Sequence, residues 1–401
     1  MAFFLNRRKE KEKKLGLYIH IPFCKSRCAY CSFFSHGGAM NPKTIDHYMQ
    51  ALADHMAETG KGTKDYVVDT IYFGGGTPTY FGAQNLDNIL DEIHRNFRVS
   101  LDPEITVEAN PDSLDEVTLK RLLKAGFNRL SIGVQSHNDE VLKVLGRPHT
   151  FAQAKEAMEL ARKVGFANIS LDLMYGLPGQ DMQMWMESVE KIVAMRPEHI
   201  SCYCLTLDED CAMYAYQRSL NIPDDDYQQR MYLMASQYLR EHGYEHYEIS
   251  NFAKKGMESR HNMKYWLGKE YIGFGPSAAS DFGGKRFKIM DDIGGYIEGI
   301  NKKGQILTEC ESVSPRERSG EYLMLRARLK RGISPKDYET RFLRSFEPLN
   351  HVMENHLRNG NVQYADGRWF LTEEGWFVSN RIIIELQEAQ RLSQPLQGKI
   401  E

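Results

Sequence analysis

Hydrophobic positions in the first half of the chain form short runs that alternate with longer amphipathic segments. The short runs are rich in β-branched and aromatic residues and predict strands at 15–21, 70–73, 104–108, 129–134, 168–174 and 199–207. The amphipathic segments repeat their apolar positions every three to four residues and predict helices at 44–58, 85–96, 113–125, 138–144, 151–164 and 182–194. Such alternation is typical of a parallel sheet covered by helices. Six units are fewer than the eight of a TIM barrel, so residues 15–210 are expected to form a partial, open (β/α)6 barrel.

The pattern changes after residue 210. A helix is predicted at 223–243, followed by a polar stretch punctuated by glycine at 249–284, so residues 211–310 are interpreted as an extension of the barrel. Asp366-Gly367 between two apolar runs predicts a β-hairpin. Helical periods flank it, at 317–331, 334–346 and 373–390. Residues 311–401 are therefore expected to form a smaller α+β domain of winged-helix-like shape.

Composition narrows the class of protein. The chain of 401 residues has 42% apolar and 26% charged residues and a net charge of −3, which gives no reason to expect nucleic-acid binding. No apolar run reaches the roughly 18 residues that a membrane-spanning helix needs, and a cytoplasmic protein is expected. Residues 1–14 form a separate arm that is basic from residue 7 onward. It is either a solvated tail or a weak electrostatic tether to an anionic membrane surface.

Three cysteines directly after the first predicted strand carry the strongest chemical signal. They are spaced as Cys24-x3-Cys28-x2-Cys31, and thiolates are the usual protein ligands of iron–sulfur clusters. This spacing is the signature of the radical SAM superfamily, which implies a [4Fe–4S] cluster. Zinc is the alternative, with His20 or His36 as a fourth ligand. Because three cysteines leave one iron without a protein ligand, the amino and carboxylate groups of S-adenosylmethionine are expected to bind there.

Other unusual residues also fall where predicted strands end. Gly74-Gly75-Gly76-Thr77 follows the second strand, and Glu108, Gln135 and Asp172 end later ones. In barrel-like folds the site is built at the carboxyl edge of the strands, so these residues are expected to lie together. Glycines there allow a ligand to approach the backbone closely.

Several longer motifs resemble the oxygen-independent coproporphyrinogen III oxidase family. These are Leu17–Cys24, Gly74–Thr79, Leu130–Ser136 and Leu171–Gln180. The oxidase branch of that family has a fourth cysteine two places after the third, where this chain has Phe33. The segment Arg260-His261-Asn262-Met263-Lys264-Tyr265-Trp266 instead matches the His-Asn-x-x-Tyr-Trp motif of the haem-chaperone branch, HemW.

The resemblance implies a protein that binds the cluster, S-adenosylmethionine and haem, and passes haem to acceptors such as respiratory cytochromes. A flavodoxin- or ferredoxin-like protein would supply electrons. The alternative is the oxidase activity itself, the oxidative decarboxylation of coproporphyrinogen III to protoporphyrinogen IX. By matched position, the resemblance assigns S-adenosylmethionine contacts to Tyr18, Tyr30, Gly75, Gly76, Thr77, Glu108, Gln135, Arg147 and Asp172.

The motif also implies haem contacts at His261, Asn262, Tyr265 and Trp266. A neutral imidazole is a common haem ligand, and aromatic rings pack well on the macrocycle. The alternative is that His261 ties down a loop by hydrogen bonds. Cys202 and Cys204 alternate along a predicted strand and are interpreted as core residues, with a ligand pair as the alternative.

Overall fold

The computed structural model describes residues 12–396 of the chain. Its centre is a run of parallel strands, each hydrogen-bonded to the next, which confirms the predicted partial barrel. These strands are β1 (Lys13–Ile21), β4 (Tyr66–Gly75), β5 (Val99–Ala109), β6 (Arg129–Gln135), β7 (Ile169–Tyr175) and β8 (His199–Cys204). Their inward and outward side chains are both largely buried, as in other parallel sheets that helices cover.

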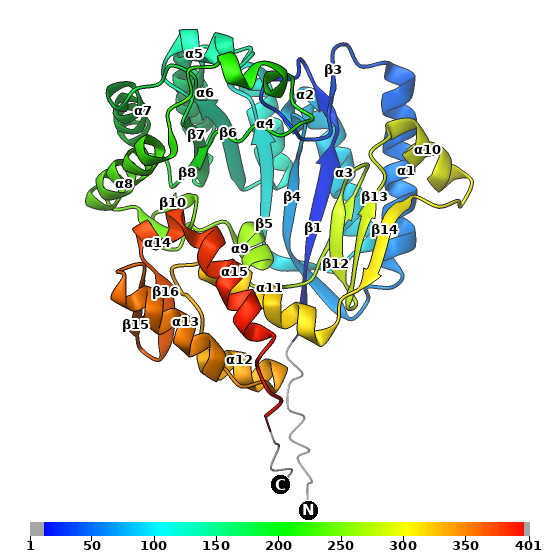
Figure 1. Ribbon diagram of the computed structural model, residues 1–401. Coiled ribbons are helices and arrows are strands. Elements are labelled where there is room, and N and C mark those ends of the chain that lie inside the picture. Colours follow the sequence, from blue (N-terminus) through cyan, green and yellow to red (C-terminus); the bar gives the residue numbers. More distant parts are fainter. Residues whose placement is uncertain (1–11, 397–401) are drawn as a thin grey trace, which may run out of the picture.

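The helices between these strands lie close to the predicted ranges and cover the outer face of the sheet (Figure 1). Most of them, α2 and α3 excepted, begin with a side-chain N-cap; Thr150, for example, forms a capping box with Gln153 at the start of α6. The helices are α1 (Pro42–Gly60), α2 (Pro78–Phe81), α3 (Ala83–Asn96), α4 (Glu116–Ala125), α5 (Asp139–Val144), α6 (Phe151–Val164) and α7 (Met182–Ala194).

The sheet continues beyond the parallel strands on both sides. Strand β11 (Tyr271–Phe274) pairs parallel to β1, and β12 (Ala279–Phe282), β13 (Lys285–Ile289) and β14 (Leu307–Ser312) follow as antiparallel neighbours. At the other side β10 (Asn251–Ala253) and β9 (Glu245–Glu248) follow β8. Within the described residues the order ends at β14 and β9, so the barrel stays open. These short strands alternate with glycine turns, which is why the polar stretch gave no strand signal.

Helices and a hairpin form the C-terminal part, which lies at the opposite end of the sheet from β3 (His36–Gly37) (Figure 1). Three helices precede the predicted hairpin, the order expected of a winged-helix-like domain. The elements are α11 (Pro315–Ala327), α12 (Pro335–Phe342), α13 (Glu347–Arg358), β15 (Val362–Ala365), β16 (Arg368–Leu371), α14 (Glu373–Phe377) and α15 (Ser379–Gln390).

Two details of this part differ from the sequence prediction. The single helix over 373–390 is wrong, because the chain leaves helical geometry at Val378 and forms α14 and α15. The buried Trp376 donates its indole N–H to the Ala327 carbonyl at 3.0 Å, which holds α14 against the end of α11. Helix α13 was not predicted, although Leu349, Met353 and His356 form its buried stripe.

Three further helices connect the sheet extensions: α8 (Asp225–Glu241), α9 (Arg260–Trp266) and α10 (Ile293–Asn301). Helix α9 packs between β4 of the sheet and α11 of the C-terminal part. Gly16 of β1 makes this approach possible, since a Cβ there would lie 2.8 Å from the side chain of Lys264. Among residues 12–396, no helix has the length and apolar character needed to cross a bilayer.

Candidate functional site

The three cysteines lie on one loop at the carboxyl edge of the sheet. Strand β2 (Phe23–Cys24) pairs with β3 and closes this loop at its base. Within it, the backbone N–H of Cys31 donates to the Cys28 carbonyl at 3.2 Å, so the last two cysteines share one tight turn. All three carry free thiols and line the same cavity. The loop geometry thus presents three thiols to one space, as a cluster with three protein ligands requires.

That cavity measures about 530 Å³ and is built from the strand ends. The cysteines line it together with every predicted S-adenosylmethionine contact except Tyr18, namely Tyr30, Gly75, Gly76, Thr77, Glu108, Gln135, Arg147 and Asp172. Tyr18 lies beside the cavity, where its ring stacks on Tyr72 with centroids 6.2 Å apart and its hydroxyl meets His20 Nδ1 at 3.0 Å. The structure therefore brings together residues that are up to 148 positions apart, from Cys24 to Asp172.

The surroundings of the thiols fit an iron–sulfur cluster. Burial raises the pKa of Cys24 and Cys31, so the thiolate form needs a positive partner, which iron provides. Thr77 Oγ1 donates to Cys24 Sγ at 3.5 Å, and Arg147 Nη1 donates to Cys28 Sγ at 3.6 Å. Hydrogen bonds and charge of this kind stabilise sulfur ligands and tune the cluster they hold.

The glycine turn at the end of β4 forms one wall of the cavity. Gly75 has φ of 108°, and a Cβ at this position would lie 2.6 Å from the His20 ring, so only glycine fits. Its N–H donates to Glu108 Oε2 at 3.2 Å, and the Tyr72 hydroxyl donates to Oε1 at 2.7 Å. Burial raises the pKa of Glu108 to about 7, because two hydrogen bonds only partly replace lost water.

Asp172 forms the opposite wall and is held by hydroxyl groups. Ser201 Oγ donates to its Oδ1 at 2.7 Å, and Ser131 Oγ to its Oδ2 at 3.3 Å. Burial raises the pKa of this carboxyl, whereas the hydroxyl hydrogen bonds and the buried Arg129 oppose the rise. A fixed carboxylate of this kind can accept hydrogen bonds from ligand hydroxyl or amino groups.

Gln135 and Arg147 complete the cavity between these walls. Gln135 has a left-handed backbone with φ of 69°, and its Oε1 accepts a hydrogen bond from the Tyr203 hydroxyl at 2.8 Å. Arg147 Nη2 donates to Asn110 Oδ1 and to the Gly133 carbonyl, each at 2.6 Å. The guanidinium is thus fixed in place next to the cysteine loop before any ligand binds.

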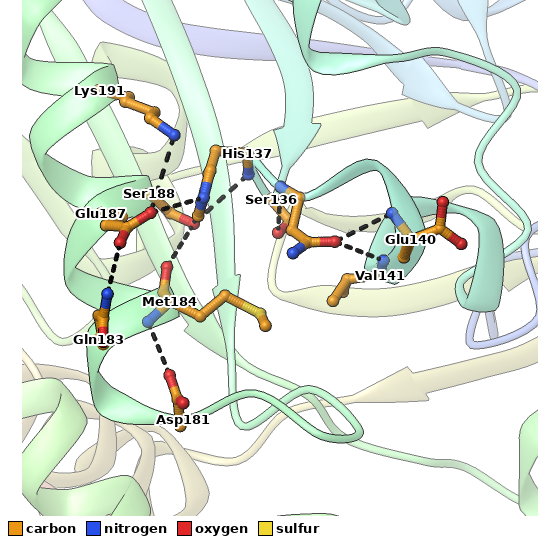
Figure 2. Close-up of polar contacts among 11 residues, drawn as sticks. Ser136, His137, Glu140, Val141, Asp181, Gln183, Met184, Glu187, Ser188 and Lys191 are labelled. Atoms are coloured by element: carbon orange, nitrogen blue, oxygen red, sulfur yellow. Dashed lines mark hydrogen bonds and ion pairs between the residues drawn. The ribbon is translucent and has the colours of Figure 1, made fainter.

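The loop that follows Gln135 is tied to α7, as Figure 2 shows. His137 Nδ1 lies 2.8 Å from Ser188 Oγ, and His137 Nε2 lies 3.2 Å from Glu187 Oε2. The trio has the residue types of a hydrolase triad, but Ser188 is fully buried and donates its hydroxyl to the Met184 carbonyl. These contacts therefore hold the loop after β6 against α7 and support the left-handed backbone at Gln135.

Helix α9 carries the predicted haem motif and divides its residues between two places. Asn262 lines the cavity of the cysteines, and Trp266 lines a separate cavity against the C-terminal part. His261 is fully buried between them: Thr70 Oγ1 lies 2.9 Å from its Nδ1 and the Tyr265 hydroxyl 2.8 Å from its Nε2. As folded here, both ring nitrogens have partners, and haem contact by His261 and Tyr265 stays a prediction.

The sequence interpretation missed several polar residues that line the same cavity. They are Tyr72, Asn110, Arg129, Ser131, His199, Ser201 and Tyr203. Arg129 and His199 are the first residues of β6 and β8, and Tyr72, Ser131 and Ser201 lie inside strands. The strand-end rule that found Glu108 therefore does not point to them. Of the two strand cysteines, Cys202 is buried in the core, as interpreted, while Cys204 reaches the cavity and donates to Gln228 Oε1 at 3.0 Å.

Fold and cavity together define a radical SAM protein. The model of the "Radical SAM superfamily" matches residues 18–192, and that of the "HemN C-terminal domain" matches residues 313–378. The solved structure of "Coproporphyrinogen III oxidase (HemN) from Escherichia coli" shares the fold, with a TM-score of 0.81 at 22% identity over 94% of this chain and 90% of that one. A superfamily protein of this kind holds a [4Fe–4S] cluster through three cysteines and binds S-adenosylmethionine.

Sequence similarity defines the family within this class. The chain is 36% identical to "Heme chaperone HemW" of Bacillus subtilis over 91% of this chain and 97% of that protein. It is 30% identical to the protein of the same name from Escherichia coli, over 92% and 97% of the two chains. The chain therefore belongs to the HemW family of radical SAM proteins.

Proposed function

We propose that this protein is a haem chaperone that binds haem on a radical SAM scaffold and transfers it to acceptor haemoproteins. The observation that carries this proposal is the similarity to proteins named "Heme chaperone HemW", which extends over about nine-tenths of the chain. The acceptors we have in mind are cytoplasm-facing proteins such as respiratory cytochromes. A flavodoxin- or ferredoxin-like donor would reduce the cluster. Of the basic stretch proposed as a membrane tether, residues 7–11 lie outside the described residues, and Lys13 and Lys14 already belong to β1.

The cavity of the cysteines is proposed to hold the cluster and S-adenosylmethionine. Cys24, Cys28 and Cys31 would bind three irons, and when bound the reduced cluster supplies one electron to the sulfonium group. Gly75 and Gly76 would let the methionine part of the ligand approach the backbone closely, and Glu108 would accept a hydrogen bond from it. Since these groups already have fixed positions, the ligand would bind with little reorganisation.

The remaining predicted contacts would hold the rest of that ligand. Asp172 and Gln135 offer fixed oxygen acceptors, and Arg147 and Tyr30 stand beside the cysteine loop. Thr77, which donates to Cys24, links the glycine wall to the cluster. Tyr18 would act through Tyr72 and His20 because it stands behind the cavity wall.

The oxidase reading is the second candidate, because the structure with a TM-score of 0.81 is that of a coproporphyrinogen III oxidase. At 22% identity that likeness concerns the fold alone. Phe33 stands where the oxidase branch has its fourth cysteine, and its side chain is 68% exposed. This residue favours the chaperone reading, since a phenyl group supplies no cluster ligand.

A paired assay separates the two candidates. Anaerobically purified, cluster-loaded protein is titrated with haem, and the complex is mixed with an apo-cytochrome while the absorbance of the reconstituted cytochrome is followed. The same preparation is incubated with coproporphyrinogen III, S-adenosylmethionine and a reductant. Haem binding and transfer without protoporphyrinogen support the proposal. Steady protoporphyrinogen formation, or failure to bind haem, would overturn it.

A further inference from the structure

A second cavity of about 450 Å³ lies at the junction between α9 and the C-terminal helices. Trp266 and Leu267 at the end of α9 form one wall, and Tyr322 and Leu325 of α11 form another, with Phe342 of α12 completing it. Its volume is within the range of about 300–1,000 Å³ that small-molecule sites occupy. It is separate from the cavity of the cysteines, with α9 between them.

At one end of this cavity two arginines form ion pairs with carboxylates. Arg318 Nη2 donates to Asp281 Oδ1 at 2.6 Å, and Arg286 Nη2 lies 2.8 Å from Glu321 Oε1. Glu270 accepts a hydrogen bond from the Gly283 N–H at 2.9 Å. Asp281 and Glu321 are therefore paired with arginines, whereas the hydrogen bond to Glu270 leaves its negative charge in place.

At the other end two arginines have no carboxylate partner. The guanidinium carbons of Arg326 and Arg341 lie 5.3 and 5.5 Å from the centre of the same Tyr322 ring. Within residues 12–396 neither arginine forms an ion pair. The charge of Asp337 acts on Arg326, but this carboxylate is paired with Arg368 at 3.3 Å. Burial lowers the pKa of Arg326, and the charges of Arg341 and Arg331 lower it further.

Two neighbouring guanidinium groups repel each other unless an anion lies between them. Each presents a planar fork of donors that matches a carboxylate, and together they match a ligand with two carboxylates. Trp266 and Phe342 offer flat apolar surface to a ring system beside those carboxylates. Haem has this combination, a planar aromatic macrocycle with two propionates on one edge.

We propose that the junction cavity binds the propionate edge of haem, with Arg326 and Arg341 on the carboxylates and the macrocycle against Trp266. This inference rests on the proposed haem-chaperone function and assigns it a site. It also gives the last residue of the haem motif a direct role, whereas His261 of the same motif faces the interior of the barrel.

The test compares haem with haem dimethyl ester, which keeps the macrocycle and iron but lacks the two charges. Both are titrated into cluster-loaded wild type, R326Q/R341Q and K330Q/R331Q. The last variant removes two positive charges just outside the cavity and serves as the matched control. Wild type and control are expected to bind haem roughly 10- to 100-fold more tightly than the ester, as charge-assisted pairs imply. R326Q/R341Q is expected to bind both ligands equally, at the affinity that wild type has for the ester.

The outcomes separate this inference from the proposed function. If wild type binds haem but R326Q/R341Q still discriminates against the ester, the site is wrong while the function stands. Equal binding of haem and its dimethyl ester by wild type would also show that the proposed site is wrong while the proposed function stands. If wild type binds neither ligand, the proposed function fails and the site with it. The single variant R341Q guards against misfolding, because Arg341 is exposed, and it is expected to lose part of the discrimination at unchanged melting temperature.

Discussion

The two cavities at the ends of α9 differ in how their charges are balanced. In the cavity of the cysteines the two buried carboxylates accept hydrogen bonds from groups of the protein, Glu108 from Gly75 and Asp172 from Ser201. In the junction cavity Arg326 and Arg341 share one tyrosine ring, and neither forms an ion pair with the described part of the chain. The first cavity therefore holds its polar groups in fixed positions before a cofactor binds, whereas the positive charge of the second would be balanced by an anionic ligand.

Helix α9 keeps these two regions apart and is anchored as a core element. Glu104 accepts hydrogen bonds from the N–H groups of Arg260 and His261 at 2.9 and 2.8 Å. Lys264 pairs with Asp69 at 2.5 Å, and both side chains are almost fully buried. The haem motif therefore does not form one site in three dimensions. Its helix separates the two cavities, with Asn262 lining one and Trp266 lining the other.

Loss of a cluster cysteine should have the largest effect, because it should remove the cofactor from the first cavity and leave the junction cavity unchanged. Cys28→Ala is expected to remove essentially all iron and acid-labile sulfide, because two thiolates do not retain a cluster of this type. The measurement is iron and sulfide analysis of anaerobically purified protein. Cys310→Ala, on the exposed strand β14, is the matched control and should keep the full content. Full iron content in the Cys28→Ala protein would contradict the assignment of the first cavity.

Removal of the buried imidazole in α9 should destabilise the whole protein. His261→Ala breaks hydrogen bonds to Thr70 and Tyr265 and leaves a hole in the core, so a loss of about 2–4 kcal/mol is expected. Tyr265→Phe, which removes one of these hydrogen bonds, should cost about 1 kcal/mol. Chemical denaturation measures both losses.

The same variants test whether His261 is a haem ligand. If it only anchors α9, folded His261→Ala protein keeps the Soret spectrum of the wild-type haem complex. A changed or absent Soret band at unchanged stability would make His261 an iron ligand. It would contradict the claim that haem binds only at the end of α9 that faces the junction cavity.

Ionisation of Glu108 should appear as a pH dependence confined to the first cavity. Its pKa is raised to about 7 from an ordinary value of 4.5, so its contribution to stability is complete below pH 4.5 and is lost as the pH rises through 7. Relative to Glu108→Gln, the apo wild type should lose about 3 kcal/mol of unfolding free energy between these pH values. Thermal or urea unfolding across this range measures the difference. Parallel pH profiles of the two proteins would mean that Glu108 titrates normally.

Removal of the contact between Ser188 and His137, which holds the loop after β6 against α7, should have the smallest effect on ligand binding. Ser188→Ala removes the hydroxyl that holds His137 and loosens the backbone at Gln135. We expect the affinity for S-adenosylmethionine to fall several-fold, corresponding to about 1 kcal/mol, with haem affinity unchanged. Calorimetric titration of each ligand gives both values. An equal loss for both ligands would show that the two cavities are coupled through this loop.

Much of the first cavity could be predicted because its residues follow a local rule. Cys24 and Glu108 stand where apolar strands end, and parallel strands bring their ends to one edge, whereas Asp172 lies in the middle of β7. Periodicity likewise predicted the parallel strands and the helices between them. Short strands such as β11 and β12 gave no such signal, because four residues are too few for a repeat and glycine turns separate them.

The second cavity could not be predicted in this way. Trp266, Tyr322 and Arg341 come from three helices that are brought together by packing between α9 and the C-terminal part, not by a shared sheet edge. Nor does the sequence tell that Arg318 pairs with Asp281 while Arg326 forms no ion pair within residues 12–396, since partners 37 residues apart depend on that packing. The burial of His261 between the cavities likewise depends on this packing and could not be predicted from the sequence.

The most direct test of the account is whether S-adenosylmethionine binds an iron of the cluster held by the three cysteines. Electron–nuclear double resonance on the reduced protein, with ligand labelled with ¹⁵N at its amino group, reports contact between that nitrogen and the cluster. The account predicts a clear nitrogen coupling in wild type, which persists in R326Q/R341Q. A cluster signal without any coupling to the labelled nitrogen would contradict it.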